Sequence, residues 1–197
     1  MLEAVAEAHK AFSVGEVPVG AVIVRDGKIL SRAHNQREST SDPLGHAELR
    51  ALQIASQNTG DWRFEGCSIY VTLEPCPMCT GALLETRMKR LIYGAADQRF
   101  GAAGSVINLA DYPGLPRRLE VKAGVLEDQC RELLARFFRR ERKKKHKERW
   151  LSWLKALDSK SSKGMMSLLR GFESLSLRSV IQRLLQMGCL FTFTRHD

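Results

Sequence analysis

Two short motifs that lie far apart in the sequence constrain the fold of this chain more than any other feature. His46-Ala47-Glu48 and Pro75-Cys76-Pro77-Met78-Cys79 together supply one imidazole, two thiols and one carboxylate. Zinc favours tetrahedral nitrogen and sulfur ligands, and a catalytic zinc site uses three protein ligands and keeps a fourth position for water. His46, Cys76 and Cys79 are therefore the predicted ligands of one Zn²⁺ per chain. The fold has to bring both motifs to a single point.

The position of each residue in these motifs fits such a site. Glu48 is not needed as a ligand, and its carboxylate is the predicted proton carrier for hydrolysis by a zinc-activated water. Inside a helix His46 and Glu48 would face opposite sides, but at a helix N-terminus their side chains can converge on one water molecule. Pro77 suits the first turn of a second helix, whose N-terminus favours the thiolate form of a cysteine ligand.

Two other interpretations of the cysteine pair compete with the catalytic one. Redox pairs and zinc ribbons also contain C-x-x-C, so this spacing by itself is a weak signal. A redox pair would not need His46-Ala47-Glu48 upstream, and a closed structural zinc site would need a second Cys or His pair, which is not evident. The catalytic interpretation is therefore preferred, and structural zinc remains the alternative.

Length and composition limit the class of protein. With 197 residues, 44% of them hydrophobic, the chain can bury one ordinary core and carry an appendage. Without an apolar run of about 18 residues a transmembrane segment is not expected, and residues 1–10 resemble neither a signal peptide nor a transit peptide. Two of the five cysteines are assigned to metal and three are left over, which suits a reducing compartment. The predicted location is the cytoplasm.

The positive charge of the chain is concentrated in one tract. Residues 131–163 contain 13 Lys or Arg and 4 Asp or Glu, which accounts for the whole net charge of +9. This tract predicts a polyanionic partner, with nucleic acid first and an anionic membrane surface second. A solvated helix end is the simpler alternative.

The order of the expected elements predicts an α/β fold. Asp26-Gly27 between two β-branched stretches is a strong hairpin signal. The pattern predicts helices at 2–13, 47–55, 77–86 and from 127, and strands at 17–25, 28–33, 67–73, 90–95 and 119–123. We therefore expect a three-layer α-β-α sandwich with a mixed five-stranded sheet. Both metal motifs then lie where helices begin.

The end of the chain differs from the rest and is expected to be a separate extension. Residues 1–149 form the predicted zinc-dependent domain, and 150–197 a C-terminal extension of unknown role. Two helical apolar stripes, at 150–157 and 180–185, flank a Ser-, Lys- and Gly-rich stretch at 159–164. Packing or partner binding is preferred over membrane binding for these stripes.

Residues 1–149 resemble the bacterial tRNA-specific adenosine deaminases of the cytidine-deaminase-like superfamily. The two metal motifs match the H-x-E…P-C-x-x-C signature of zinc-dependent nucleobase deaminases. The narrower resemblance rests on a set of motifs, namely Glu16-Val17-Pro18-Val19-Gly20-Ala21-Val22, Asn35, His46-Ala47-Glu48, Thr72-Leu73-Glu74-Pro75-Cys76-Pro77-Met78-Cys79, Gly101-Ala102-Ala103-Gly104-Ser105 and Phe137-Phe138-Arg139. The last two motifs separate the tRNA branch from the rest of the superfamily.

The resemblance implies a role for each matching residue. His46, Cys76 and Cys79 would bind zinc, and Glu48 would carry protons. Asn35 would hydrogen-bond the target nucleotide, and Asp97 with its loop would border the RNA. The other implied substrate contacts are the pocket residues Glu16, Val17, Pro18 and Ala47, and the anticodon-loop contacts Phe137, Phe138 and Arg139. An aromatic pair beside Arg can stack extruded bases, although one of the two rings is expected to anchor the helix instead.

The leading hypothesis is hydrolysis of adenosine to inosine at the wobble position of a tRNA anticodon, by a cytoplasmic homodimer that binds the anticodon stem-loop. The second hypothesis is a deaminase of a free base or nucleoside, of the guanine or cytosine type, with the same zinc core. Such an enzyme has no need of the basic tract at 131–163. A third class, an RNA-binding module with an inactive site, is disfavoured by the intact ligand set and Glu48.

Overall fold

The computed structural model describes residues 1–158. The chain divides into two compact units, Met1–Glu141 and Arg142–Asp197. The first unit contains the whole sheet and both metal motifs. The apolar stripe predicted at 180–185 and the stretch at 159–164 lie outside the described residues. Among the described helices, none is long and apolar enough to cross a membrane.

The sheet of the first unit is mixed, as the sequence predicts. Its five strands are β1 (Gly20–Arg25), β2 (Lys28–His34), β3 (Ser68–Leu73), β4 (Arg90–Ala95) and β5 (Glu120–Lys122). They lie in the order β2-β1-β3-β4-β5. The hairpin at Asp26-Gly27 joins β1 to β2, and β1 pairs antiparallel with both of its neighbours. The β3, β4 and β5 strands are parallel to one another, so their carboxyl ends meet at one edge.

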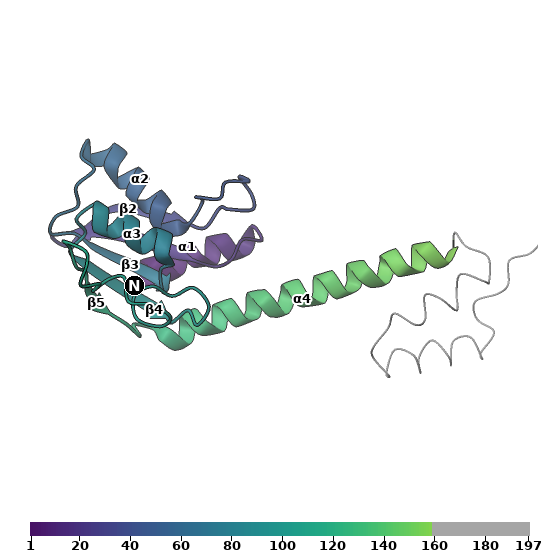
Figure 1. The fold of residues 1–197 in the computed structure, drawn as a ribbon. Helices are drawn as coiled ribbons and strands as arrows, with labels where there is room; N and C mark the ends of the chain where they lie inside the picture. Colours follow the sequence, from purple (N-terminus) through teal and green to yellow (C-terminus); the bar gives the residue numbers. More distant parts are fainter. Residues whose placement is uncertain (159–197) are drawn as a thin grey trace, which may run out of the picture. The chain divides into compact units, whose positions relative to one another are not determined.

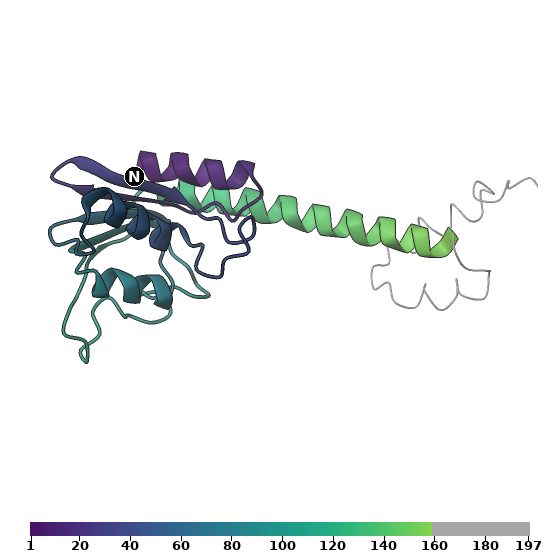
Figure 2. The same cartoon turned by 90° about the horizontal axis from the view of Figure 1, so that it is seen from above.

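Helices cover both faces of this sheet (Figures 1 and 2). They are α1 (Leu2–Ser13), α2 (Ala47–Thr59), α3 (Pro77–Glu85) and α4 (Glu127–Asp158). The α2 and α3 helices contact each other, and α2 packs on β1 and β2. Figure 2 shows α1 and the first turns of α4 on the opposite face. The predicted three-layer α/β fold is confirmed, and within residues 1–158 each predicted helix and strand of the sandwich is present with bounds within a few residues.

The core lies between the sheet and these helices. Ile23, Ile69, Val71 and Leu91 from the three central strands are fully buried, and Phe64, on the connection before β3, is 1% exposed. Such burial of branched side chains from adjacent strands is the main favourable term for a domain of this size. The core fixes the ends of β3 and β4, and these ends position the site.

The first turns of α4 are anchored to the first unit by one buried stripe. Cys130, Leu133 and Phe137 recur at helical spacing and are 2%, 4% and 5% exposed. Gly94 of β4 makes this approach feasible, because a Cβ there would lie 2.4 Å from Cys130 Sγ. At the far end of the same stripe, the Phe137 ring meets the Phe12 ring of α1 edge-on at 6.1 Å.

Candidate metal centre and active site

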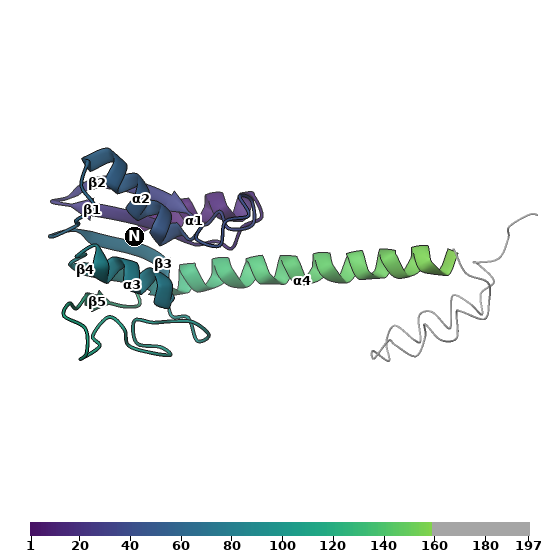
Figure 3. The same cartoon turned by 45° about the horizontal axis from the view of Figure 1, so that its top comes forward.

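Both metal motifs lie at helix N-termini, as the sequence predicts. His46 is the N-cap of α2, and Cys76 is the N-cap of α3, with Pro77 following in the first turn. The α3 motif follows directly on β3, at the edge where the parallel strands end (Figure 3). Glu48 and Cys79 each belong to the first turn of their helix. The two helices pack together, and this packing brings the motifs to one place.

The geometry of the three predicted ligands suits a small tetrahedral metal ion. Their ligand atoms all lie within 4.8 Å of one another. His46 Nδ1 is 3.5 Å from Cys79 Sγ and 3.8 Å from Cys76 Sγ. Zn–N and Zn–S bonds of ordinary length at a tetrahedral angle place nitrogen and sulfur roughly 3.5 Å apart. The group can therefore hold a metal ion with little rearrangement.

Electrostatics ties the fourth residue, Glu48, to the same cluster. The Glu48 side chain is 4% exposed, and burial raises the pKa of its carboxyl group. It forms a hydrogen bond with Cys79.

The pKa of Cys76 is lowered to about 4, first by the hydrogen bond from Cys79 and then by its contact with His46. The bond to Cys76 and burial raise the pKa of Cys79. The pKa of His46 is raised, chiefly by Cys76. The two cysteines, the imidazole and the buried carboxyl group therefore influence one another's protonation.

Asn35 is held beside the metal motif by a buried carboxylate. Its Nδ2 donates to Glu16 Oε2 at 2.9 Å, and the Ser39 backbone N–H donates to Glu16 Oε1 at 2.6 Å. Glu16 is 1% exposed. Burial alone would raise its pKa, but the hydrogen bonds from Ser39 and Asn35 outweigh burial and lower it. The Gln36 N–H donates to the Gly45 carbonyl at 2.9 Å, so the loop from Asn35 to His46 is closed at its base.

The remaining predicted pocket residues differ in burial and in their hydrogen bonds. Ala47 is fully buried, Pro18 is buried, and Val17 packs against the core. Asp97 follows β4, and its Oδ1 accepts hydrogen bonds from the Arg99 and Phe100 backbone N–H groups at 2.9 and 3.2 Å. The roles of these residues toward a substrate stay predictions.

The predicted RNA-contacting residues on α4 have different surroundings. Phe137 is 5% exposed and packs on Phe12, whereas Phe138 is 44% exposed. Arg139 is exposed, and the neighbouring Arg140 places its guanidinium 4.3 Å from the Phe12 ring centroid. Of the two rings, Phe137 is the one whose burial fits anchoring of the helix. Phe138 is the one whose ring is exposed, and its predicted contact with RNA stays a prediction.

One buried carboxylate next to the cluster was not among the predicted site residues. Glu74 is 2% exposed and stands between the end of β3 and Pro75. Its carboxylate accepts backbone N–H groups of the segment that follows β4. A charged residue at the end of an apolar strand was the signal that could have indicated it, since such a side chain is buried only when it is hydrogen-bonded.

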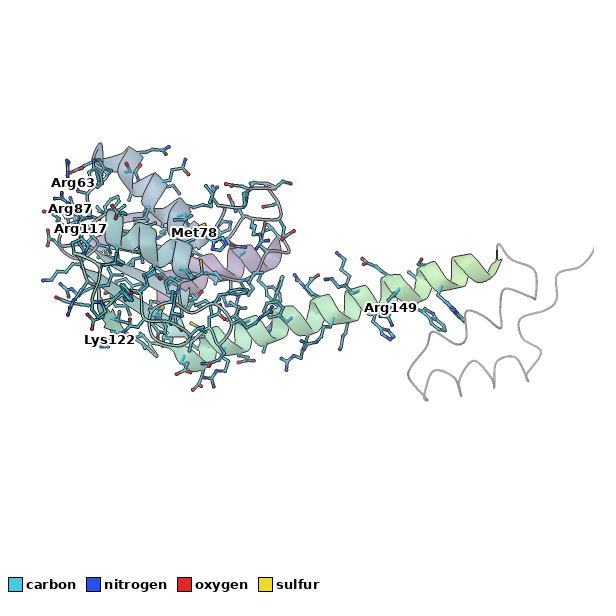
Figure 4. The ribbon with its side chains drawn as sticks, in the orientation of Figure 1. Arg63, Met78, Arg87, Arg117, Lys122 and Arg149 are labelled. Carbon is cyan, nitrogen blue, oxygen red and sulfur yellow. The ribbon has the colours of Figure 1, made fainter. Side chains whose placement is uncertain are left out.

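A cleft of about 510 Å³ lies at the other end of the parallel strands. Its lining includes Arg87 and Lys89, which precede β4, and Arg117. Figure 4 shows Arg63, Arg87 and Arg117 together, with Met78 of the metal motif away from them. The cations pair with exposed carboxylates, as in the contacts of Arg87 with Glu65 at 2.7 Å and of Arg117 with Glu85 at 3.6 Å. This cleft is separate from the metal cluster.

Known proteins resemble this chain over the part that contains the site. The family of MafB19-like deaminases matches residues 1–142. A tRNA-specific adenosine deaminase of Bacillus subtilis (strain 168) is 46% identical over 145 residues, which cover 74% of this chain and 90% of the relative. One of Aquifex aeolicus is 45% identical over 139 residues, covering 71% of this chain and 91% of the relative.

Solved structures show the same fold. One from studies of A-to-I editing by tRNA:A34 deaminases at the wobble position of transfer RNA aligns with a TM-score of 0.66 at 37% identity, covering 68% of this chain and 96% of that one. A guanine deaminase from Nitrosomonas europaea aligns with a TM-score of 0.58 at 19% identity, covering 68% of this chain and 80% of that one. At that identity the second likeness shows the fold alone.

Proposed function

Since the chain belongs to the family of the tRNA-specific adenosine deaminases, we propose that it hydrolyses adenosine to inosine at the wobble position of a tRNA anticodon, with release of ammonia. The observation that carries this proposal is the placement of buried Glu48 beside His46, Cys76 and Cys79. A carboxyl group next to a three-ligand metal cluster is the arrangement that hydrolytic deamination needs.

The donor set indicates zinc as the metal. One imidazole and two thiolates are borderline and soft ligands, which zinc prefers over the oxygen ligands that suit magnesium or calcium. The nitrogen–sulfur distances of 3.5 and 3.8 Å fit its bond lengths. Zinc bound there would lower the pKa of a water molecule and so supply a nucleophile at neutral pH.

Glu48 moves the protons in the proposed reaction. Burial raises the pKa of its carboxyl group above the ordinary value, so the group takes up a proton more readily than an exposed carboxylate does and can pass it on. It takes one proton from the attacking water and delivers it to N1 of the adenine. It then takes the proton of the new C6 hydroxyl group and passes it to the exocyclic amino group, which leaves from C6 as ammonia while the C6 carbonyl forms. Attack of water and loss of ammonia together convert adenine to hypoxanthine.

Asn35 and the pocket residues hold the nucleotide. The Asn35 amide donates through Nδ2 to Glu16, so its carbonyl oxygen is the atom that faces the nucleotide. Ala47, Val17 and Pro18 supply the apolar wall on which an extruded base can pack. Glu16 acts here by orienting Asn35.

RNA outside the pocket is held by the basic helix and by Asp97 with its loop. On α4, Phe138 stacks on a flanking base and Arg139 meets phosphate, while Phe137 anchors the helix. The exposed cations from Arg142 to Arg149 add sequence-independent attraction for the RNA backbone. With tRNA as the substrate, the proposed location of the reaction is the cytoplasm.

The proposed assembly is a homodimer. Four apolar side chains in the segment 106–115 are exposed to between 37% and 54%, namely Val106, Ile107, Tyr112 and Leu115. Exposed apolar groups gathered in one segment mark a contact with another protein surface. Sedimentation at the assay concentration tests this assembly, and a monomer that is fully active would contradict it.

Inosine formation on an anticodon stem-loop tests the function. The stem-loop carries adenosine at the wobble position, and free adenosine, guanine and cytosine are assayed beside it with the zinc-loaded chain. Inosine on the stem-loop alone is the expected result. Turnover of a free base with none on RNA would replace the proposal by a small-substrate deaminase. Glu85→Gln is the matched control for site variants, because Glu85 is 84% exposed at the far end of α3.

A further inference from the structure

Glu74 is enclosed by backbone N–H groups of one loop. Its Oε1 accepts from the Ala103 and Ser105 N–H groups at 2.9 and 3.0 Å, and its Oε2 accepts from the Asp97 N–H at 3.1 Å. The side chain is 2% exposed, so these bonds are shielded from water. Hydrogen bonds to a buried carboxylate are stronger than neutral ones, and a donor left without an acceptor there is costly.

The loop 97–105 is thereby fixed to the metal motif. Glu74 and Pro75 directly precede the predicted ligand Cys76, and the Pro75 carbonyl accepts from the Ala102 N–H at 2.9 Å. The loop folds closely over the carboxylate at Gly101. A Cβ added there would lie 2.4 Å from Glu74 Oε2 and 2.5 Å from the Asp97 carbonyl oxygen. The Gly101 backbone therefore packs directly against the Glu74 carboxylate.

The outer side of the same loop presents a cation and an aromatic ring. Phe100 is 60% exposed, and the Arg99 guanidinium carbon lies 5.5 Å from its ring centroid. An exposed ring beside Arg is the pairing that single-stranded RNA uses, because bases stack on the ring and phosphates meet the cation. The position of these two side chains relative to the metal motif therefore depends on the loop beneath them.

We propose that Glu74 is a positioning residue that fixes the loop 97–105 to the Cys76 side of the metal cluster, so that Phe100 and Arg99 meet the RNA strand next to the bound nucleotide. This inference rests on the proposed function, since it needs an RNA substrate. Glu74 does not touch the reacting atoms. It acts through the loop, and its effect is on substrate binding more than on the chemical step.

Glu74→Gln in the zinc-loaded full chain tests the inference. Glutamine keeps the volume and one oxygen, but its amide nitrogen cannot accept from a backbone N–H. One charge-assisted bond is removed, which corresponds to about a tenfold change in an equilibrium constant. We expect KM for the stem-loop to rise about tenfold, kcat to stay within about twofold and zinc content to be unchanged. Hydrogen exchange at the Asp97, Ala103 and Ser105 amides should become faster.

Two further variants separate positioning from a general loss of stability. Gly101→Ala disturbs the same contact from the loop side and should raise KM in the same way. Phe100→Ala removes the ring through which Glu74 acts. In the double variant of Glu74→Gln with Phe100→Ala, KM should therefore rise by less than the product of the two single effects. Glu85→Gln, the exposed control, should leave KM and amide exchange unchanged.

The outcomes distinguish this inference from the proposed function. An unchanged KM in Glu74→Gln, or a fall in kcat that follows loss of zinc or of folded protein, would overturn the positioning role. Strictly multiplicative effects with Phe100→Ala would overturn it as well. Wild-type chain that forms no inosine on the stem-loop would overturn the proposed function instead. Amide exchange needs no substrate, so it still decides whether Glu74 fixes the loop.

Discussion

The metal cluster and the basic part of α4 are built for opposite kinds of contact. In the cluster, Cys79 is fully buried and Glu48 is 4% exposed. In α4, every side chain from Arg142 to Arg149 is exposed. In an enclosed site, the loss of a single functional atom can abolish the chemistry, because no other group can take its place. Exposed charges each contribute little and act as a sum. Mutational effects should therefore fall steeply from the cluster to the tract.

Cys79→Ala should have the largest effect. Cys79 offers one of the three candidate ligand atoms that the described residues bring together, and loss of a thiolate ligand removes both metal affinity and the local geometry that depends on it. We expect loss of bound zinc and of detectable turnover, measured by metal analysis and by inosine formation. Cys67→Ala is the matched control, since Cys67 is equally buried but lies before β3. Full zinc in Cys79→Ala would remove that cysteine from the ligand set.

Glu48→Gln should abolish turnover and leave the metal in place. The amide fills the same buried volume but cannot carry protons. General acid–base groups contribute about 10²- to 10⁴-fold, and one carboxylate serves several transfers here, so kcat should fall by about 10⁴-fold or more. Zinc content and stem-loop affinity should match wild type. A variant that retains more than about a tenth of the wild-type rate would show that another group carries the protons.

The cluster could be predicted from sequence because its chemistry is local. The two motifs contain the three candidate ligands that the structure brings together and also Glu48, and Pro77 marks the helix start that the structure places there. Strand alternation and the Asp26-Gly27 turn likewise indicate the sheet. Each of these signals depends on neighbours within a few residues. The predicted boundary at residue 149 has no such signal, lies within α4 and stays a prediction.

Glu74 could not be predicted in the same way. Its partners are backbone N–H groups of an irregular loop, and a backbone donor leaves no mark in the sequence. Phe137 and Phe138 are an intermediate case. The spacing of Cys130, Leu133 and Phe137 on one helical stripe was available and favours burial of Phe137. A sequence pattern can therefore indicate which face of a helix is buried. It does not indicate which backbone groups a buried carboxylate will bind.

Phe137 and Phe138 sharpen the comparison, because they are adjacent and differ only in burial. Phe138→Ala should weaken stem-loop binding by roughly 1 to 3 kcal/mol if its ring stacks on a base, with little change in salt dependence. Phe137→Ala should instead lower the free energy of unfolding by about 3 to 5 kcal/mol, because it empties a packed site on Phe12. Binding isotherms and thermal unfolding measure the two effects. Equal loss of affinity in both variants at full stability would contradict this division.

Substitutions in the basic tract should have the smallest effect per residue replaced. Replacing Lys143, Lys144 and Lys145 together by Ala should weaken stem-loop binding and flatten its dependence on salt. The slope of log affinity against log salt should fall by about one for each phosphate that the protein no longer neutralises, because fewer counterions are released on binding. The choice of adenosine should not change, since phosphate contacts position the RNA and base contacts specify it.

A control with the same loss of charge decides whether the position of these lysines matters. Lys28, Lys89 and Lys122 are exposed residues of the sheet and its turns, and their joint replacement by Ala also removes three positive charges. If the basic tract meets phosphates, only the Lys143, Lys144 and Lys145 variant flattens the salt slope. If both triple variants lower affinity equally, net charge alone attracts the RNA. If the variant at Lys143, Lys144 and Lys145 binds the stem-loop like wild type at every salt concentration, the tract is a solvated helix end. The basic part of α4 would then have no part in holding RNA.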